Sequence, residues 1–413
     1  SEQMAEKEKQ IRVVWECSDD YENLDQSEFN FYPIWEEEQI TLGADVETPY
    51  ITVRFEPEGA FDAKEPLVLS VEEGGKLSEQ LLELSEEELG QHNGRLTIVL
   101  NGNTADTGDI VLPSDLGLEQ VMLTSSDSAD YKVGASPVRL FANGIPFILE
   151  HGTLGSLYGG GKDVSLTSTD ITITGGVISG SPSADKGIVV GGSLLTKSGT
   201  NVSVLESCSI TISGVNMSFN NLYGGCFTNS QGVRADIGST NITIEDSALS
   251  VYMISGGSFI WSYGSGVELN LEKSNIWIEN SEITCKTQFK DPTYAIYGGH
   301  IGNDDVKGKR LNLGESNITI AGSSIDGDIY GGHYDNVSAE EIGLDQVNID
   351  IADSSVCGVI GGGYYDGAYN HTTGDISIRM EDCEIGESRM VGENMVMGGD
   401  IYFIDENTEE SPL

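Results

Sequence analysis

Residues 241–244 read Asn-Ile-Thr-Ile, and this motif recurs as Asn-Ile-Trp-Ile at 275–278 and as Asn-Ile-Thr-Ile at 317–320. Each motif belongs to a three-point signature with an apolar residue at position i, another at i+2 and a small residue at i+5. Two apolar residues two positions apart lie on the same face of a β-strand, and the small residue fits a tight corner. The copies of the signature are Val164/Leu166/Thr169, Val202/Val204/Ser207, Ile242/Ile244/Ser247, Ile276/Ile278/Ser281, Ile318/Ile320/Ser323, Ile349/Ile351/Ser354 and Ile378/Met380/Cys383.

A glycine pair follows the copies of the signature. Gly-Gly permits a positive φ angle and a close approach between two backbones. One copy cannot bury its own apolar row, whereas stacked copies bury a continuous ladder of Ile and Val. The sequence therefore predicts a parallel β-helix, an all-β solenoid with about 4.8 Å between rungs. The pairs begin at Gly191, Gly224, Gly256, Gly298, Gly331, Gly361 and Gly398.

The length of the coils indicates which kind of solenoid to expect. Coils of 30 or more residues with irregular loops favour the right-handed type of β-helix. A β-propeller would need four antiparallel strands in each blade, and its blade signatures are missing. Helical repeats are excluded because the apolar residues are β-branched and do not follow a period of 3.6. We expect eight to ten coils over residues 96–404, followed by an acidic tail at 405–413.

The first 95 residues differ from the rest because acidic residues are denser there and glycines are scarcer. Short runs of strand-forming residues predict a small β-rich module in residues 1–95. Residues 76–89 predict one or two helical turns at the junction, with Ser85 and Glu88 at the spacing of a capping box. The expected strands are residues 11–15, 29–35, 50–55 and 67–71.

The charge of the chain excludes several functions. Of its 413 residues, 67 are acidic and 21 are basic, which gives a formal net charge of −46. So large a negative charge excludes binding to nucleic acid or to an anionic membrane surface. No apolar run approaches the roughly 20 residues of a membrane span, and we expect no membrane insertion. The six cysteines form no CxxC pair, so we expect buried free thiols rather than a zinc site or a redox site.

The words Tyr158-Gly-Gly, Tyr223-Gly-Gly, Tyr297-Gly-Gly and Tyr330-Gly-Gly resemble the repeats of adhesin-like, cell-surface β-helix proteins of Gram-positive gut bacteria. The resemblance covers residues 96–404 and rests on the style of the repeat, not on a catalytic motif. It implies a secreted or wall-associated protein, and we expect the chain to be extracellular and monomeric.

The sharpest candidate site follows the later glycine pairs. Equivalent positions on adjacent coils lie side by side, so we expect His300 and His333 to be neighbours and the tyrosines to form an aromatic shelf. Aromatic faces combined with carboxylates are typical of a carbohydrate site. An ordinary polar outer loop of a solenoid would look similar. The candidate ligand-binding residues are His300, His333, Tyr334, Asp335, Tyr364, Tyr365 and Asp366.

Calcium is a possible ligand of the same region, held by Asp304, Asp305 and Asp335; otherwise no cofactor is expected. We expect the protein to bind a polysaccharide, or a glycan or protein of a host surface, without catalysis. One alternative is a glycoside hydrolase or lyase with carboxylates on adjacent coils. Another is a structural spacer. The candidate carboxylates of the enzyme alternative are Asp326, Asp328, Asp335, Asp350, Asp353 and Asp366.

Overall fold

The computed structural model divides into two compact units, residues 1–65 and 66–413. In the first unit it describes only three strands. The antiparallel sheet that they form has the order β1-β3-β2. Two of the expected strand runs are therefore present, whereas the run at 29–35 lies outside the described residues. The described ranges are 11–16, 38–41, 50–57, 65–136, 138–180, 186–261, 266–286, 295–303, 310–335, 341–362, 364–365, 371–386, 395–396 and 401–402. The three strands are β1 (Ile11–Glu16), β2 (Glu38–Thr41) and β3 (Tyr50–Pro57).

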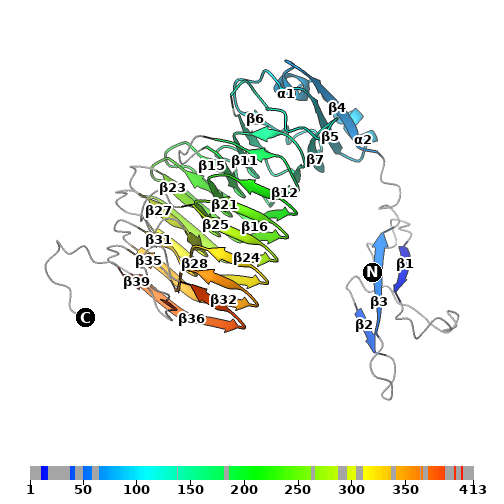
Figure 1. Cartoon of the computed structure of the whole chain (residues 1–413). Coiled ribbons are helices and arrows are strands. Elements are labelled where there is room, and N and C mark those ends of the chain that lie inside the picture. Colours follow the sequence, from blue (N-terminus) through cyan, green and yellow to red (C-terminus); the bar gives the residue numbers. More distant parts are fainter. Residues whose placement is uncertain are drawn as a thin grey trace, which may run out of the picture. The chain divides into compact units, whose positions relative to one another are not determined.

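The second unit is a parallel β-solenoid, as the sequence predicts. Each coil contributes one strand to a long sheet, and its equivalents on neighbouring coils pair with it in parallel. Figure 1 shows these long strands stacked in chain order from β4 to β36. The long sheet consists of β4 (Leu67–Glu72), β5 (Arg95–Asn101), β7 (Gln120–Ser125), β9 (Phe147–Leu149), β12 (Thr169–Ile173), β16 (Asn201–Ser213), β20 (Arg234–Glu245), β24 (Glu268–Glu279), β28 (Arg310–Ala321), β32 (Glu341–Ala352) and β36 (His371–Glu381).

From β16 onward, three short strands complete each coil before the next long strand begins. They build a second, a third and a fourth sheet. The second sheet consists of β17 (Asn216–Ser218), β21 (Ala248–Val251), β25 (Glu282–Cys285), β29 (Ser324–Asp326), β33 (Ser355–Cys357) and β37 (Glu384–Gly386). The third consists of β6 (Ile110–Val111), β8 (Arg139–Phe141), β11 (Ser156–Tyr158), β14 (Ile188–Val190), β18 (Asn221–Tyr223), β22 (Met253–Ser255), β26 (Ala295–Tyr297), β30 (Asp328–Tyr330), β34 (Val359–Gly361) and β38 (Met395–Val396). The fourth consists of β15 (Leu194–Leu195), β19 (Phe227–Thr228), β23 (Phe259–Trp261), β27 (Ile301–Asn303), β31 (Tyr334–Asp335), β35 (Tyr364–Tyr365) and β39 (Ile401–Tyr402), and a small pair is formed by β10 (Thr153–Leu154) and β13 (Val177–Ile178).

The first coil contains helix as well as strand. Strand β4 pairs in parallel with β5, so the solenoid begins at Leu67, about one coil earlier than the predicted boundary at residues 95 and 96. Helices α1 (Leu77–Leu81) and α2 (Glu86–Gln91) follow β4, and their leucines are buried in the solenoid core. Ser85 is the N-cap of α2 and accepts a hydrogen bond from the Glu88 backbone N–H, as its spacing predicts. No helix of the described residues is long and apolar enough to cross a membrane.

Every long strand from β16 to β32 carries two apolar rows rather than one. The inward alternation of β20 is interrupted at Gly238–Ser239 and then resumes. The signature copies that begin at Val164 and Val202 belong to the first row, as the pairing of Val202 with Ala235 shows. The five copies from Ile242 onward belong to the second row. The signature therefore marks two different positions in the coil, which the sequence alone merged into one.

In the five pairs from Gly191 to Gly331, the first glycine packs against the long strand. A Cβ atom on Gly298 would lie 1.9 Å from Oγ of Ser316 in β28 and 2.2 Å from the carbonyl oxygen of Gly331 on the next coil. Gly298 does not adopt a positive φ angle. Of the two reasons that the sequence suggests for a glycine pair, close approach therefore applies at this position and backbone handedness does not.

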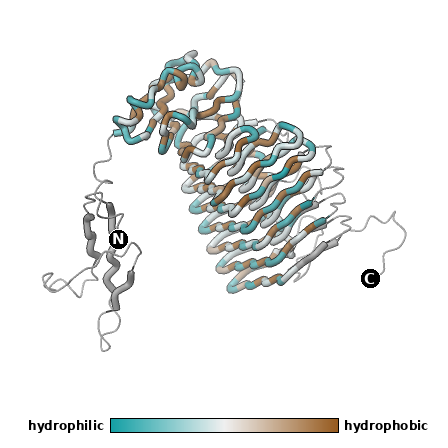
Figure 2. Tube along the Cα trace, turned by 180° about the vertical axis from the view of Figure 1, so that it is seen from behind, coloured by the Kyte–Doolittle hydropathy of each residue, from teal (hydrophilic) through white to brown (hydrophobic). Residues whose placement is uncertain are grey.

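Hydrophobic side chains form two clusters, one on each side of the third sheet. The main cluster fills the coils from Val71 to Ile360, and Figure 2 shows hydrophobic and hydrophilic residues alternating along them. The second cluster holds the tyrosine of the Tyr-Gly-Gly words, whose side chain is fully buried in each case. Tyr297 and Tyr330 stack with ring centroids 5.2 Å apart. The tyrosine of the Tyr-Gly-Gly motif therefore packs neighbouring coils against each other. The four tyrosines are Tyr158, Tyr223, Tyr297 and Tyr330.

We predict that Gly298→Ala lowers the free energy of unfolding by about 3 kcal/mol, because the added methyl group overlaps backbone that cannot move away. Gly90→Ala in α2 is the control, since its Cβ would meet no atom within 4 Å and alanine favours a helix over glycine by about 1 kcal/mol. Urea unfolding of both variants measures the difference. Equal stability of Gly298→Ala and wild type would contradict the close-approach explanation.

Candidate functional site

A polar groove of about 810 Å³ runs along the corner between the long sheet and the second sheet. We call it the corner groove. It crosses six coils, which is about 24 Å at the usual strand spacing. Its first wall is formed by Gly214, Asp246, Asn280, Gly322, Asp353 and Asp382, its floor by Val215, Ser247, Ser281, Ser323 and Ser354, and its second wall by Asn216, Ala248, Glu282, Ser324, Ser355 and Glu384.

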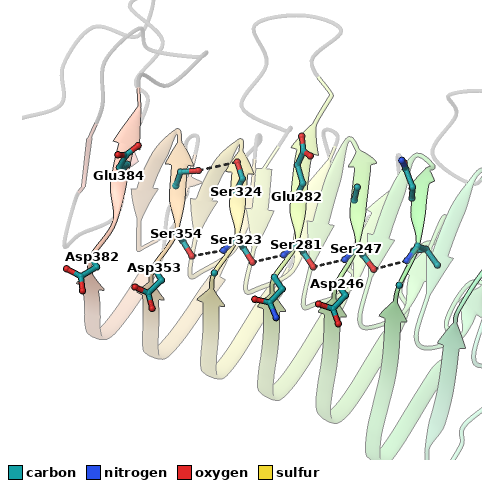
Figure 3. Close-up of a pocket in the computed structure, with 17 residues that line it drawn as sticks. Asp246, Ser247, Ser281, Glu282, Ser323, Ser324, Asp353, Ser354, Asp382 and Glu384 are labelled. Atoms are coloured by element: carbon teal, nitrogen blue, oxygen red, sulfur yellow. Dashed lines mark hydrogen bonds between the residues drawn. The ribbon is translucent and has the colours of Figure 1, made fainter.

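The first wall follows from the shape of the corner. On the six coils of the groove, the residue after the long strand adopts a left-handed backbone, with φ of 49° at Asp246, 48° at Asn280 and 49° at Asp353. Asp, Asn and Gly are the residues that tolerate this conformation best. Their side chains are exposed, and Figure 3 shows the labelled aspartates projecting from the corner on one side of the floor.

The floor of the corner groove is a ladder of serine hydroxyls. Oγ of Ser323 donates to the carbonyl oxygen of Ala321 at 2.8 Å and accepts the backbone N–H of Ser281 at 3.0 Å. The same pair of hydrogen bonds recurs at Ser247, Ser281 and Ser354. Figure 3 shows the bond of each pair that joins two coils. These serines are the small residues at i+5 of the signature. Their hydroxyls join neighbouring coils, which leaves ligand contacts to the two walls.

The walls give the corner groove a negative charge. Five of the lining residues are carboxylates, and no Lys or Arg is among them. Two carboxylates, Asp382 and Glu384, lie on one coil on either side of Cys383 in the sequence, and Figure 3 shows them on opposite sides of the floor. A neutral or cationic ligand fits this surface, whereas an anionic polymer would be repelled. The five are Asp246, Glu282, Asp353, Asp382 and Glu384.

The outer face of the long sheet adjoins the first wall and carries an amide ladder. Nδ2 of Asn275 donates to Oδ1 of Asn241 at 2.9 Å, and Asn317 and Asn348 continue the chain at 3.0 and 2.8 Å. The ladder runs along the solenoid axis and lies within the strands of the long sheet rather than at a corner of the coil. Beside it stands Trp277, whose side chain is 44% exposed.

His300 and His333 are neighbours, as the sequence predicts, but both side chains are fully buried. Their rings stack with centroids 5.3 Å apart. Nδ1 of His300 accepts the backbone N–H of Ser258 at 2.8 Å, and Nδ1 of His333 accepts that of His300 at 2.9 Å. Nε2 of His300 lies 3.2 Å from the carbonyl oxygen of Asn312. The pair therefore joins coils, and neither ring is exposed to a ligand at the surface.

The other residues of the predicted site are described only in part. Tyr334, Asp335, Tyr364 and Tyr365 lie in paired strands of the fourth sheet, with Tyr334 beside Tyr364. Adjacency along the axis is thus confirmed for their backbones. Asp304, Asp305 and Asp366 lie outside the described residues. Within the described part of the chain, no three His, Cys, Asp or Glu side chains gather as a metal site would require.

The sequence analysis missed most of the corner groove. Of its five carboxylates, only Asp353 was among the candidates. The signal was present as Asp, Asn or Gly at i+4 of the signature, directly before the small residue. Another candidate, Asp328, is buried and accepts the backbone N–H of Val359 at 2.7 Å, which is a structural role.

We predict that acid destabilises the solenoid through the histidine pair. Burial and the neighbouring His333 hold the pKa of His300 well below its ordinary value of 6.5. The unfolded chain then binds a proton more readily than the folded one, so stability present above pH 6.5 is lost as the pH falls below it. Protonated Nδ1 could no longer accept the N–H of Ser258.

Thermal unfolding between pH 8 and pH 5 measures this effect. The double variant His300→Ser/His333→Ser is the control, because Ser258 occupies the equivalent position one coil earlier and its Oγ accepts a backbone N–H in the same way. We expect the variant to be less stable but to lose less stability over this pH range. An identical pH profile for the two proteins would refute the prediction.

The serine floor yields a second prediction. Ser323→Ala leaves the buried backbone N–H of Ser281 without its acceptor, and we expect a loss of about 1–3 kcal/mol in the free energy of unfolding. Ser355→Ala on the second wall removes only a surface hydrogen bond to Ser324 and should change stability by less than about 0.5 kcal/mol. Chemical denaturation of both variants tests the ladder, which fails if the two losses are equal.

Comparison with known proteins adds no further assignment. No family model, no curated protein and no solved structure matches the chain.

Proposed function

We propose that this chain is an extracellular, adhesin-like protein whose solenoid binds an extended glycan in the corner groove without cleaving it. The observation that carries the proposal is the continuity of the groove over six coils. A polymer can follow such a groove along the axis and meet at least one hydroxyl, amide or carboxylate group at every rung. Polar side chains that converge on an open groove suit the hydroxyls of a sugar.

The character of the walls narrows the class of glycan. The groove contains carboxylates without any lysine or arginine, so a polyuronate would be repelled and a neutral polymer or one of amino sugars is favoured. The net charge of −46 acts in the same direction. The Tyr-Gly-Gly repeat style supports the extracellular, cell-surface part of the proposal. The proposal includes calcium as an additional ligand, which Asp304, Asp305 and Asp335 would hold through their carboxylate oxygens.

We predict that the protein is retained by a neutral β-glucan and by chitosan but not by polygalacturonate. The chain is incubated with each polymer, with calcium or with EDTA, and both bound protein and released oligosaccharide are measured. Retention by chitosan should weaken as salt rises, because exposed charges are screened. If the protein binds neither the β-glucan nor chitosan, the proposal is overturned and the structural spacer is the better account.

The variant Glu282→Ser/Glu384→Ser locates the binding site. Serine occupies the equivalent positions 324 and 355 on other coils, so the fold should be preserved. We expect roughly tenfold weaker binding, since a hydrogen bond to a charged group contributes about 1.5–3 kcal/mol. Glu83→Ser/Glu87→Ser makes the same change in charge outside the groove and should bind as the wild type does.

One observation favours the enzymatic alternative, and the same incubation tests it. Asp382 and Glu384 stand on opposite sides of the floor (Figure 3), as the two carboxyl groups of a glycoside hydrolase do. Both are exposed, whereas a general acid is usually kept protonated by burial. Release of oligosaccharides that is abolished by Asp382→Asn and by Glu384→Gln would replace binding with hydrolysis.

A further inference from the structure

The first wall of the corner groove is interrupted at one coil. Gly322 stands where the neighbouring coils place Asn280 and Asp353, so no side chain rises there. The preceding residue, Ala321, is also small, and it pairs with the larger Glu279 on the coil before. Ala352 occupies the same column on the coil after. Two small residues and a glycine therefore lower the edge of the groove over this part of the corner.

The opening leads to the outer face of the long sheet beside Trp277. Trp277 lies in strand β24, one coil before the opening. It pairs with Thr319 in β28, and Glu279, two residues after Trp277, pairs with Ala321. Among the aromatic side chains whose burial the structure describes, Trp277 alone is exposed. Its Nε1 donates to Oε2 of Glu279 at 3.2 Å. The hydrogen bond along the strand holds the indole while leaving it 44% exposed.

The residues around the indole of Trp277 are polar and have short side chains. Thr243 and Thr319 occupy the same column on the two neighbouring coils, and both are smaller than the indole. The amide ladder runs alongside, with Asn275 two residues before Trp277 on the same strand. A solvent-exposed aromatic face next to fixed hydroxyl and amide groups matches the two faces of a pyranose, whose C–H side is apolar and whose hydroxyls form hydrogen bonds.

We propose that Trp277 is a stacking platform for a pyranose ring, and that the glycan passes between this platform and the corner groove over Gly322. The inference rests on the proposed function and extends it to a neutral or amino-sugar chain built of pyranose units. The corner groove holds the glycan along the solenoid axis. At the opening, one end of the glycan turns onto the outer face of the long sheet.

Closing the opening is the most specific test. Gly322→Asn gives this coil the residue that the coil before carries as Asn280 in the same left-handed backbone. The closest atom to the new Cβ would be Oδ1 of the flexible Asn280 side chain, at 2.8 Å. Gly199→Asn makes the same substitution outside the groove, at a left-handed position with φ of 74° where the Cβ would meet no atom within 4 Å. We expect Gly322→Asn to weaken binding of the β-glucan and chitosan about tenfold, and Gly199→Asn to leave it unchanged.

The platform itself is tested by Trp277→Ala and Trp277→Phe. The alanine variant should lose about tenfold in affinity for the same two polymers, and the phenylalanine variant should recover part of it, because a smaller aromatic face remains. Tryptophan fluorescence gives a second readout. The wild type should show a change on binding that Trp277→Phe lacks, since that variant has lost the reporting indole while keeping a ring.

The outcomes separate this inference from the proposed function. Loss of binding in Glu282→Ser/Glu384→Ser together with full binding in Gly322→Asn and Trp277→Ala would overturn the platform and leave the corner groove as the site. Loss in Trp277→Ala without loss in Gly322→Asn would overturn the path over Gly322. If the wild type binds neither polymer, both proposals fail.

Discussion

Parallel pairing between successive coils is the constraint on which the rest of this structure depends. Each long strand is hydrogen-bonded to its equivalent on the next coil, which fixes the spacing of equivalent residues at about 4.8 Å. Whatever side chain the repeat places at a position then recurs as a row along the axis. Rows of serine, asparagine, tyrosine and histidine all arise in this way. The same spacing makes a groove out of a corner, because each coil adds one short segment of wall.

The rows that join coils and the rows that face solvent have different chemistry. At the floor, each serine Oγ accepts an N–H from the coil before and donates to a carbonyl of its own coil. On the long sheet, each asparagine amide can donate to one neighbouring coil and accept from the other. Carboxylates repel one another at this spacing, and the first wall breaks its row of aspartates with Asn280 and Gly322. The walls can therefore vary from coil to coil, whereas the floor keeps a hydroxyl over four consecutive coils.

The fold could be predicted from the sequence because two apolar residues at i and i+2 and a recurrent glycine pair have few structural explanations. The limits of that prediction have physical causes. The interruption at Gly238–Ser239 gives a long strand two apolar rows with similar local sequence, so the signature could not tell them apart. Strand β4 lies in an acidic stretch before a helical segment, and its pairing with β5 is a long-range contact that no local pattern reports.

The candidate site shows the same division between what repeats reveal and what they conceal. A repeat states which residues are neighbours along the axis, and it placed His300 beside His333 correctly. It does not state on which side of the backbone a side chain lies after a glycine corner, and both rings are buried. The two rings are buried because each accepts a backbone N–H of the coil before, that of Ser258 or that of His300, which needs an acceptor. Only the three-dimensional structure shows this requirement.

Function on such a scaffold is expected where the frame does not need the residue. The serine floor and the glycine pairs are held by contacts between coils, and changing them costs stability. Gly322 and the side chains of Glu282 and Trp277 are not part of those contacts, and the equivalent positions on other coils carry different residues in the same backbone. A solenoid can therefore alter its ligand through wall and face residues while the rungs stay the same. That separation explains why the repeat signature identified the fold readily and the site hardly at all.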